Sequence, residues 1–134
     1  MNEPIRYLAC IMLEAVTPLA VGSGQKNLWV DKVVARDANG LPYIPGTSLT
    51  GVLRHAINDL PKQALSQAID LEDLFGAGGK KGKGSRLVVS SACMVGDEGR
   101  VIEELRALDF TQGIYSYFDR LPERDHVRIT HQGV

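Results

Sequence analysis

The chain has 134 residues, of which 44% are hydrophobic and 23% charged, and its formal net charge at pH 7 is −1. This length allows one domain around one core, and the composition is that of an ordinary globular protein. There is no apolar run long enough for a transmembrane helix and no leader-like N-terminus, so we expect a cytoplasmic protein with no membrane partner. The near-zero net charge excludes a chain that is basic throughout, so any nucleic-acid contact must come from a local cluster of cations.

The first predicted element is a strand at residues 5–16, an apolar run that ends before Thr17 and Pro18. A run that is apolar on both faces is typical of a central strand covered on both sides. A segment rich in glycine and proline follows at residues 18–45, with a short extended piece expected at residues 28–36.

Two helices are predicted next. Residues 47–60 place apolar side chains at the spacing of one helical stripe, and Thr47 or Ser48 can cap the exposed amides at its start. A second helix is predicted at residues 64–75, because a glycine, Gly76, follows it as a stop signal.

A glycine- and lysine-rich segment at residues 76–84 predicts a mobile loop. Beyond it we expect a strand at 86–95, a short helix at 101–108, and strands at 114–118 and 126–130. This order of elements indicates an α+β domain of the ferredoxin-like kind, spanning residues 1–134 as a single unit.

Four cations and no acid lie between residues 76 and 90, namely Lys80, Lys81, Lys83 and Arg86. Flexible backbone amides and ammonium groups suit a phosphate chain, and a solvated basic loop fits the same composition. A nucleotide-hydrolysing P-loop does not fit, because that motif needs Ser or Thr after Gly-Lys and this chain has Gly84 there.

The start of the predicted helix at residues 47–60 is a second candidate. Gly46 followed by Thr47 and Ser48 presents free amides and the positive end of the helix dipole, which favour an anion. Arg54 follows on the same helix. An ordinary helix cap accounts for the same residues, so the pattern alone leaves both interpretations open.

Several of these features occur together in one protein family. Residues 17–24 (TPLAVGSG) resemble the TPLHIGSG segment of RAMP-superfamily proteins, and residues 41–54 (LPYIPGTSLTGVLR) resemble their PxIPGSSLKGxLR motif. Residues 74–76 together with 85–90 resemble an FG…SRLxFSDA stretch, and residues 126–129 resemble part of VxIDRxTG. The chain is therefore similar to RAMP proteins, and in particular to the backbone subunit of type III CRISPR effector complexes.

The resemblance implies a modified ferredoxin-like, RRM-like core whose copies stack along a guide RNA beside other CRISPR effector subunits. Family members continue beyond the VxIDRxTG segment into a second helix and a last strand, whereas this chain ends there. We therefore expect an incomplete core, exposed apolar sheet surface and self-association.

In type III backbone subunits an aspartate in a VDxPIxR context cuts target RNA in a divalent-metal-dependent reaction. Residues 29–36 (WVDKVVAR) fall in that place, so the resemblance makes Asp31 the expected catalytic residue and metal ligand, with Asp37 as second choice. The metal is expected to be Mg²⁺, required for cleavage only. Lys26 and Lys32 supply nearby cations.

The expected function is binding of guide RNA and cleavage of complementary target RNA. The alternatives are a non-catalytic RNA-binding subunit and an oligomerising assembly fragment. Thr50 replaces the lysine of the SSLKG motif and Ser91 replaces the aspartate of SDA, so details of guide binding transfer less directly. The residues expected to contact RNA are Lys26, Lys32, Arg36, Gly46, Thr47, Ser48, Arg54, Lys80, Lys81, Lys83, Ser85 and Arg86.

Overall fold

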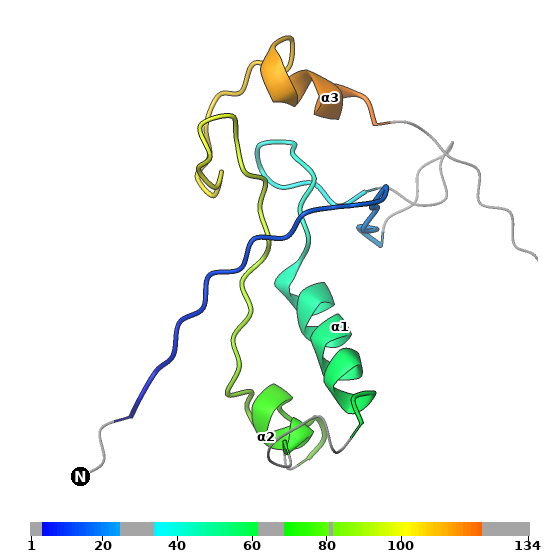
Figure 1. The fold of residues 1–134 in the computed structure, drawn as a ribbon, viewed down its shortest axis with the longest axis vertical. Helices are drawn as coiled ribbons and strands as arrows, with labels where there is room; N and C mark the ends of the chain where they lie inside the picture. The colour runs from blue at the N-terminus through cyan, green and yellow to red at the C-terminus, as the bar shows by residue number, and fades with distance from the viewer. Residues whose placement is uncertain (1–3, 25–33, 62–68, 81, 122–134) are drawn as a thin grey trace, which may run out of the picture.

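The computed structural model describes residues 4–24, 34–61, 69–80 and 82–121 (Figure 1). The helical elements are α1 (Gly46–Asn58), α2 (Leu71–Phe75), the 3-10 helix η2 (Gly113–Tyr115) and α3 (Ser116–Asp119). No helix within these ranges is long and apolar enough to cross a bilayer.

The described segments pair through isolated antiparallel bridges and not through long strands. The bridges join Gly22 to Val34, Arg36 to Pro42, Ile44 to Ala92, and Val95 to Val101. Each bridge connects one extended segment to the next, which gives the spatial order 22, 34–36, 42–44, 92–95, 101. The arrangement is the outline of an antiparallel sheet, and the full α+β sheet expected from the sequence is not formed within the described ranges.

A tight turn joins the second and third of these segments. The Asp37 carboxylate accepts hydrogen bonds from the amides of Asn39 (2.9 Å) and Leu41 (3.0 Å). The Asn39 side-chain amide then donates to the carbonyl of Glu104 and accepts from the amide of Arg106, both at 2.9 Å. The Asn39 side-chain amide thus pairs with this backbone as a neighbouring strand would, and it connects the turn to the segment that follows residue 101.

The core of the described chain is small. Ala35, Leu41 and Ile102 are buried on the bridged segments, and Leu41 is completely shielded from solvent. Phe75 is buried separately, at the end of α2. Because so few large side chains are shielded, hydrogen-bonded turns and local pairing carry much of the geometry.

Helix α1 begins and ends within two residues of the predicted 47–60, so this prediction is confirmed. The predicted cap is wrong, because Pro45 is the N-cap and no side chain caps the helix. The Thr50 hydroxyl donates instead to the carbonyl of Gly46 at 2.7 Å, a bond back along the helix.

Helix α2 confirms only part of the helix predicted at residues 64–75. Leu71–Phe75 is helical and is capped by the Asp70 carboxylate, which accepts from the amides of Glu72 (2.9 Å) and Asp73 (3.1 Å). Residues 62–68 lie outside the described ranges. An aspartate that caps in this way fixes the helix start, because its side chain replaces the carbonyl that the first amides lack.

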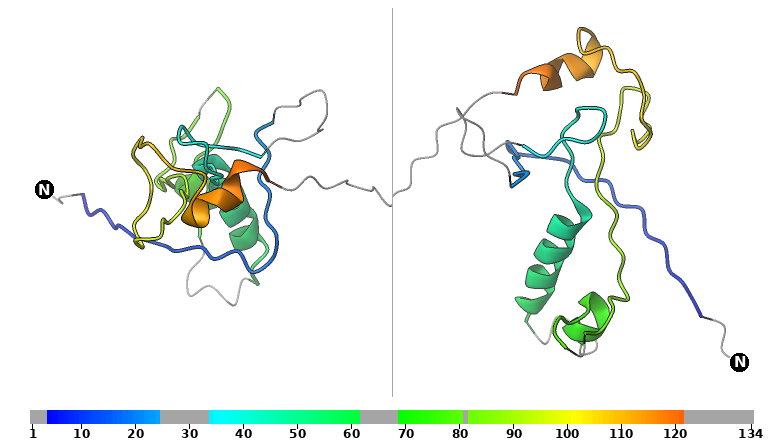
Figure 2. Two further views of the ribbon diagram at one scale, coloured as in Figure 1. Left: turned by 90° about the horizontal axis from the view of Figure 1, so that it is seen from above. Right: turned by 180° about the vertical axis from the view of Figure 1, so that it is seen from behind.

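The prediction of a covered central strand at residues 5–16 is wrong for this chain. The segment is extended, and its N-terminal end projects away from the other elements (Figures 1 and 2). It makes no bridge to any described segment, and Tyr7 and Val16 are 92% and 93% exposed. A run that is apolar on both faces needs a neighbour on each face, and the described residues supply neither.

Two further predictions are wrong. The helix expected at residues 101–108 is an extended segment, because Val101 pairs with Val95 and the amide of Ile102 donates to the carbonyl of Met94 at 2.9 Å. β-Branched residues after a glycine turn favour such a hairpin over a helix. The predicted strand at residues 114–118 is helical, as η2 and α3.

The strand predicted at residues 86–95 is extended but bridges neighbours only at Ala92 and Val95. The strand predicted at residues 126–130 lies outside the described ranges.

Candidate nucleic-acid interface

An open cleft of about 350 Å³ lies beside the start of α1. It is lined by Gly22, Ser23, Val34, Ala35, Arg36, Tyr43 and Pro45. Pro45 is also the residue that precedes the first turn of α1. The cleft therefore joins the first helical turn to the paired segments at 22 and 34–36.

The predicted catalytic loop begins and ends at this cleft. Gly22 and Val34 are bridged, and the amide of Ala35 donates to the carbonyl of Val21 at 2.7 Å. Lys26, Asp31 and Lys32 follow Gly22 and precede Val34, and they lie outside the described ranges. Their attachment points are thus fixed at the cleft wall.

Arg36 lies at the cleft, and one nitrogen of its guanidinium makes hydrogen bonds within the protein. Its Nη1 donates to the carbonyls of Gly40 and Phe118, at 2.5 and 2.8 Å. The side chain remains exposed. A guanidinium has five N–H donors, so these bonds orient Arg36 and leave donors directed to solvent.

Asp37, the second catalytic candidate, accepts two turn amides and so has a structural role in the described chain. Within the described ranges, no group of three or more His, Cys, Asp or Glu side chains could hold a metal ion.

The first turn of α1 packs against the extended segment 89–92. The Gly46 amide donates to the Ser91 hydroxyl at 3.2 Å, and Ile44 and Ala92 exchange backbone hydrogen bonds of 3.0 and 2.9 Å. A Cβ on Gly46 would collide with the carbonyl oxygen of Val89. Glycine is therefore required at this position by close backbone approach.

The hydroxyls next to Gly46 are exposed. Among the described residues, the amide of Thr47 and the hydroxyls of Thr47 and Ser48 make no hydrogen bond. An unpaired amide and two free hydroxyls at the positive end of a 13-residue helix are donors suited to an anion.

The glycine–lysine segment is a hairpin whose base is closed. Ala77 and Lys83 form an antiparallel bridge, with backbone bonds of 3.0 and 2.9 Å. Gly76 before it has φ of 81°, and a Cβ there would lie 2.7 Å from the Lys83 carbonyl oxygen, so the closure needs glycine. The Ser85 hydroxyl lies 3.0 Å from the Leu74 carbonyl oxygen and is used within this closure.

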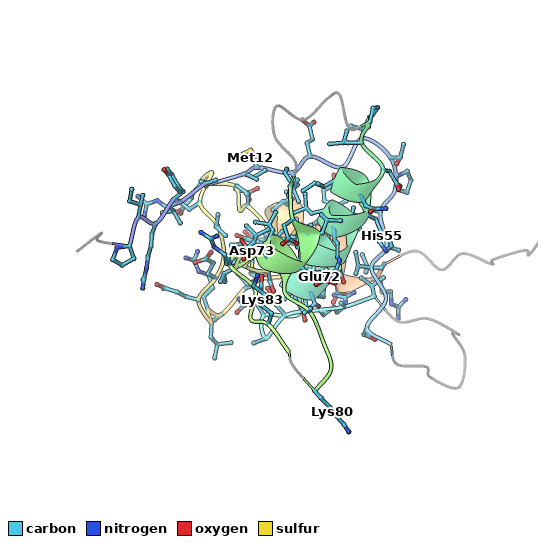
Figure 3. All side chains as sticks on the ribbon, turned by 90° about the horizontal axis from the view of Figure 1, so that it is seen from below. Met12, His55, Glu72, Asp73, Lys80 and Lys83 are labelled. Carbon is cyan, nitrogen blue, oxygen red and sulfur yellow. The ribbon has the colours of Figure 1, made fainter. Side chains whose placement is uncertain are left out.

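The cations of this hairpin differ in their surroundings. Lys83 Nζ lies 2.7 Å from Asp73 Oδ1, and Arg86 Nη1 lies 2.8 Å from Asp73 Oδ2. The hydrogen bonds from Lys83 and then Arg86 lower the pKa of Asp73, and the bond to Asp73 raises the pKa of Lys83. Lys80 extends from the hairpin tip away from the other elements (Figure 3), and Lys81 lies outside the described ranges.

The structure thus gathers the described candidates at two places along α1. Gly46, Thr47 and Ser48 form its first turn, and Arg36 lines the cleft beside the preceding Pro45. Arg54 Nη1 donates to the Gly76 carbonyl at 3.4 Å, which joins the helix to the base of the hairpin. Eight residues separate Gly46 from Arg54 in the sequence, which corresponds to about 12 Å along the helix axis.

Comparison with known proteins identifies the family. The family model of the RAMP superfamily matches residues 12–134, nearly the whole chain. The chain belongs to the RAMP superfamily. No curated protein and no solved structure matches it.

Membership indicates a CRISPR-associated, RNA-binding role, because RAMP proteins generally bind RNA and assemble with other CRISPR effector subunits. The family's fold is generally ferredoxin-like, whereas the described residues form only isolated antiparallel bridges and not a complete sheet of that kind.

Two side chains of this region were not anticipated from the sequence. Ser91 accepts the Gly46 amide from 45 positions away, at the place where the related motif has an aspartate. Asp73, on the preceding helix, forms ion pairs with both Lys83 and Arg86. The motif comparison singled out position 91 as a departure, whereas no local pattern pointed to Asp73 as a partner of those cations.

Proposed function

We propose that this RAMP protein is a backbone subunit of a type III CRISPR effector complex, which binds guide RNA and cleaves complementary target RNA through Asp31 with Mg²⁺. The observation that carries the proposal is the cleft beside the start of α1. There Pro45, which directly precedes α1, Arg36 and both attachment points of the Asp31-bearing loop come together.

The RNA contacts follow from the donors at that place. The unpaired Thr47 amide and the exposed hydroxyls of Thr47 and Ser48 can donate to a phosphate oxygen, and Arg36 supplies a positive charge at the cleft that Pro45 also lines. None of these groups selects a base, so binding should tolerate many RNA sequences. Sequence selection would then rest on pairing between guide and target.

The cleavage step uses chemistry that RNA carries itself. The ribose 2′-OH attacks the adjacent phosphorus, and the 5′-oxygen of the next nucleotide leaves. A loop carboxylate such as Asp31 can accept or orient the proton of the attacking hydroxyl, and the loop cations Lys26 and Lys32 can stabilise charge on the phosphate. Asp31 would hold Mg²⁺ together with a substrate phosphate, and the ion would supply stabilisation of negative charge on the phosphate oxygens.

The test is a cleavage assay with guide RNA, labelled complementary target RNA and Mg²⁺, run with wild type and with Asp31→Asn. Asparagine keeps the size of the side chain and removes its charge. Glu98→Gln is the matched control, because Glu98 is an exposed turn carboxylate away from the cleft. The assay is repeated with partner subunits, since stacked subunits can complete one another's sites.

We expect wild type and Glu98→Gln to cut the target and Asp31→Asn to bind RNA without cutting. Binding by all three proteins without cleavage, with partners present, would reject the catalytic proposal and leave a structural RNA-binding subunit. Cleavage that persists in Asp31→Asn would place the catalytic group elsewhere.

A second candidate, an assembly fragment, is favoured by the exposed apolar segment at residues 5–16. Such a segment presents unpaired backbone groups and apolar side chains to another chain. Concentration-dependent self-association without any salt-sensitive RNA binding would support this candidate, because phosphate contacts make RNA binding weaken with salt.

A further inference from the structure

The cations Lys83 and Arg86, at the base of the glycine–lysine hairpin, already bind a carboxylate of the protein itself. The two oxygens of the Asp73 carboxylate are taken by different cations, Oδ1 by Lys83 at 2.7 Å and Oδ2 by Arg86 at 2.8 Å. Figure 3 shows Asp73 and Lys83 together, while Lys80 points away at the hairpin tip. The carboxylate therefore lies between two cations in the way that a bound oxyanion would.

The backbone holds this arrangement in place. The amides of Arg86 and Leu87 both donate to the Leu74 carbonyl, at 3.1 and 3.0 Å, directly after Asp73 on α2. The bridge between Ala77 and Lys83 fixes the other cation. Lys83 and Arg86 are thus brought to the same carboxylate by the closure of the hairpin, and the pair of cations is formed before any ligand arrives.

Both cations remain accessible. The Lys83 and Arg86 side chains are 52% and 74% exposed, whereas that of Asp73 is 34% exposed. Ion pairs at such exposure are weak and are screened by salt. A polyanion that brings a phosphate to this place can therefore compete with the carboxylate.

We propose that Asp73 is an intramolecular competitor of the RNA backbone, which occupies the anion site formed by Lys83 and Arg86 until a phosphate displaces it. The inference rests on the proposed RNA-binding function and adds a means by which the chain weakens its own affinity. Lys83 and Arg86 then contact RNA only after their bonds to Asp73 open.

The test compares Asp73→Asn with Glu72→Gln. Both substitutions remove one negative charge from α2, but the Glu72 side chain makes no hydrogen bond or ion pair among the described residues. Affinity for a fluorescein-labelled single-stranded RNA is measured by anisotropy with the full chain over a range of salt concentrations. The Asp73→Asn variant should bind about two- to fivefold more tightly than the Glu72→Gln variant at low salt, with the difference shrinking as salt rises.

Removing both cations shows whether the tighter RNA binding of Asp73→Asn arises from them. In a Lys83→Ala, Arg86→Ala background, the gain from Asp73→Asn should disappear, because the cations that it frees are absent. Circular dichroism checks that each variant retains its helices, and Asp73→Ser replaces Asp73→Asn if the latter loses them.

The outcomes separate the two proposals. If wild type binds no RNA, with or without partner subunits, the proposed function fails. If wild type binds RNA but Asp73→Asn binds no more tightly than Glu72→Gln, Asp73 is not a competitor. Weaker binding by Asp73→Asn would overturn the inference in the other direction, since Asp73 would then be positioning the two cations for phosphate.

Discussion

Replacing Gly46 by alanine tests the contact that holds the start of α1. A Cβ there would lie 3.1 Å from the carbonyl carbon and 3.2 Å from the carbonyl oxygen of Ser90, and closer still to the oxygen of Val89. These are backbone atoms, which cannot rotate away as a side chain can. The segment must therefore move, and its pairing with Ile44 is strained.

The size of the effect follows from comparison with Gly51, in the same helix. Forcing one extra methyl group into a packed place costs about 1–3 kcal/mol. A Cβ on Gly51 would meet nothing within 4 Å, and the residue is exposed in the helix interior, so alanine there should gain about 0.5–1 kcal/mol. The two variants should therefore differ by about 1.5–4 kcal/mol in unfolding free energy.

Urea unfolding followed by far-ultraviolet circular dichroism measures this difference directly. Gly51→Ala should unfold at a higher urea concentration than wild type, and Gly46→Ala at a lower one, with similar slopes. If Gly46→Ala were as stable as Gly51→Ala, the close approach of residues 89–92 to the helix start would be refuted. Loss of RNA binding in Gly46→Ala is interpretable only after this stability difference is known.

Three other perturbations have defined outcomes. Asp37→Ala removes the acceptor of two turn amides and should lower the unfolding free energy by about 1–3 kcal/mol in urea; an unchanged value would contradict the turn. The hydrogen bonds from Lys83 and then Arg86 lower the pKa of Asp73 below its ordinary value of 3.8, so the stabilisation by these ion pairs is present above that value and is lost as pH falls through the lower folded-state pKa. In acid titrations, the stability difference between wild type and Asp73→Asn should vanish over that range, and a difference that grew in acid would contradict the ion pair. Burial raises the pKa of the Cys93 thiol, so iodoacetamide should alkylate exposed Cys10 first near neutral pH, as mass spectrometry of the digest would show; faster alkylation of Cys93 would contradict its half-buried position.

The elements that the sequence predicted correctly are those set by local interactions. Helix α1 was predicted from the apolar spacing of residues 47–60, a signal that acts within a few residues. The turn at residues 38–40 is likewise of local origin, because the Asp37 carboxylate accepts hydrogen bonds from two nearby amides. Such signals need no knowledge of the rest of the fold.

The elements that were predicted wrongly depend on distant partners. Residues 101–108 have a composition compatible with a helix, but Asn39 and Val95 hold this segment extended from elsewhere in the chain. Residues 5–16 have the composition of a covered strand, and no described segment covers them. Pattern within a segment cannot report whether the neighbour that it requires is present.

The candidate site shows the same division between local motif and distant contact. The sequence predicted a helix from Thr47, one residue after the observed start at Gly46, while the serine that accepts the Gly46 amide comes from position 91. The predicted catalytic residue, Asp31, lies outside the described ranges, so its role stays a prediction.

The charge of the hairpin in the folded chain differs from the charge counted along its sequence. Residues 76–90 contain no acid, so a count along that window gives a strongly basic loop. Asp73 lies only three positions before the window, and the closure of the hairpin places it against two of the four cations. Affinity for a phosphate chain depends on the charge left unpaired in space, and here that charge is smaller than the sequence count. A basic window therefore predicts phosphate binding only after the acids brought to it by the fold have been subtracted.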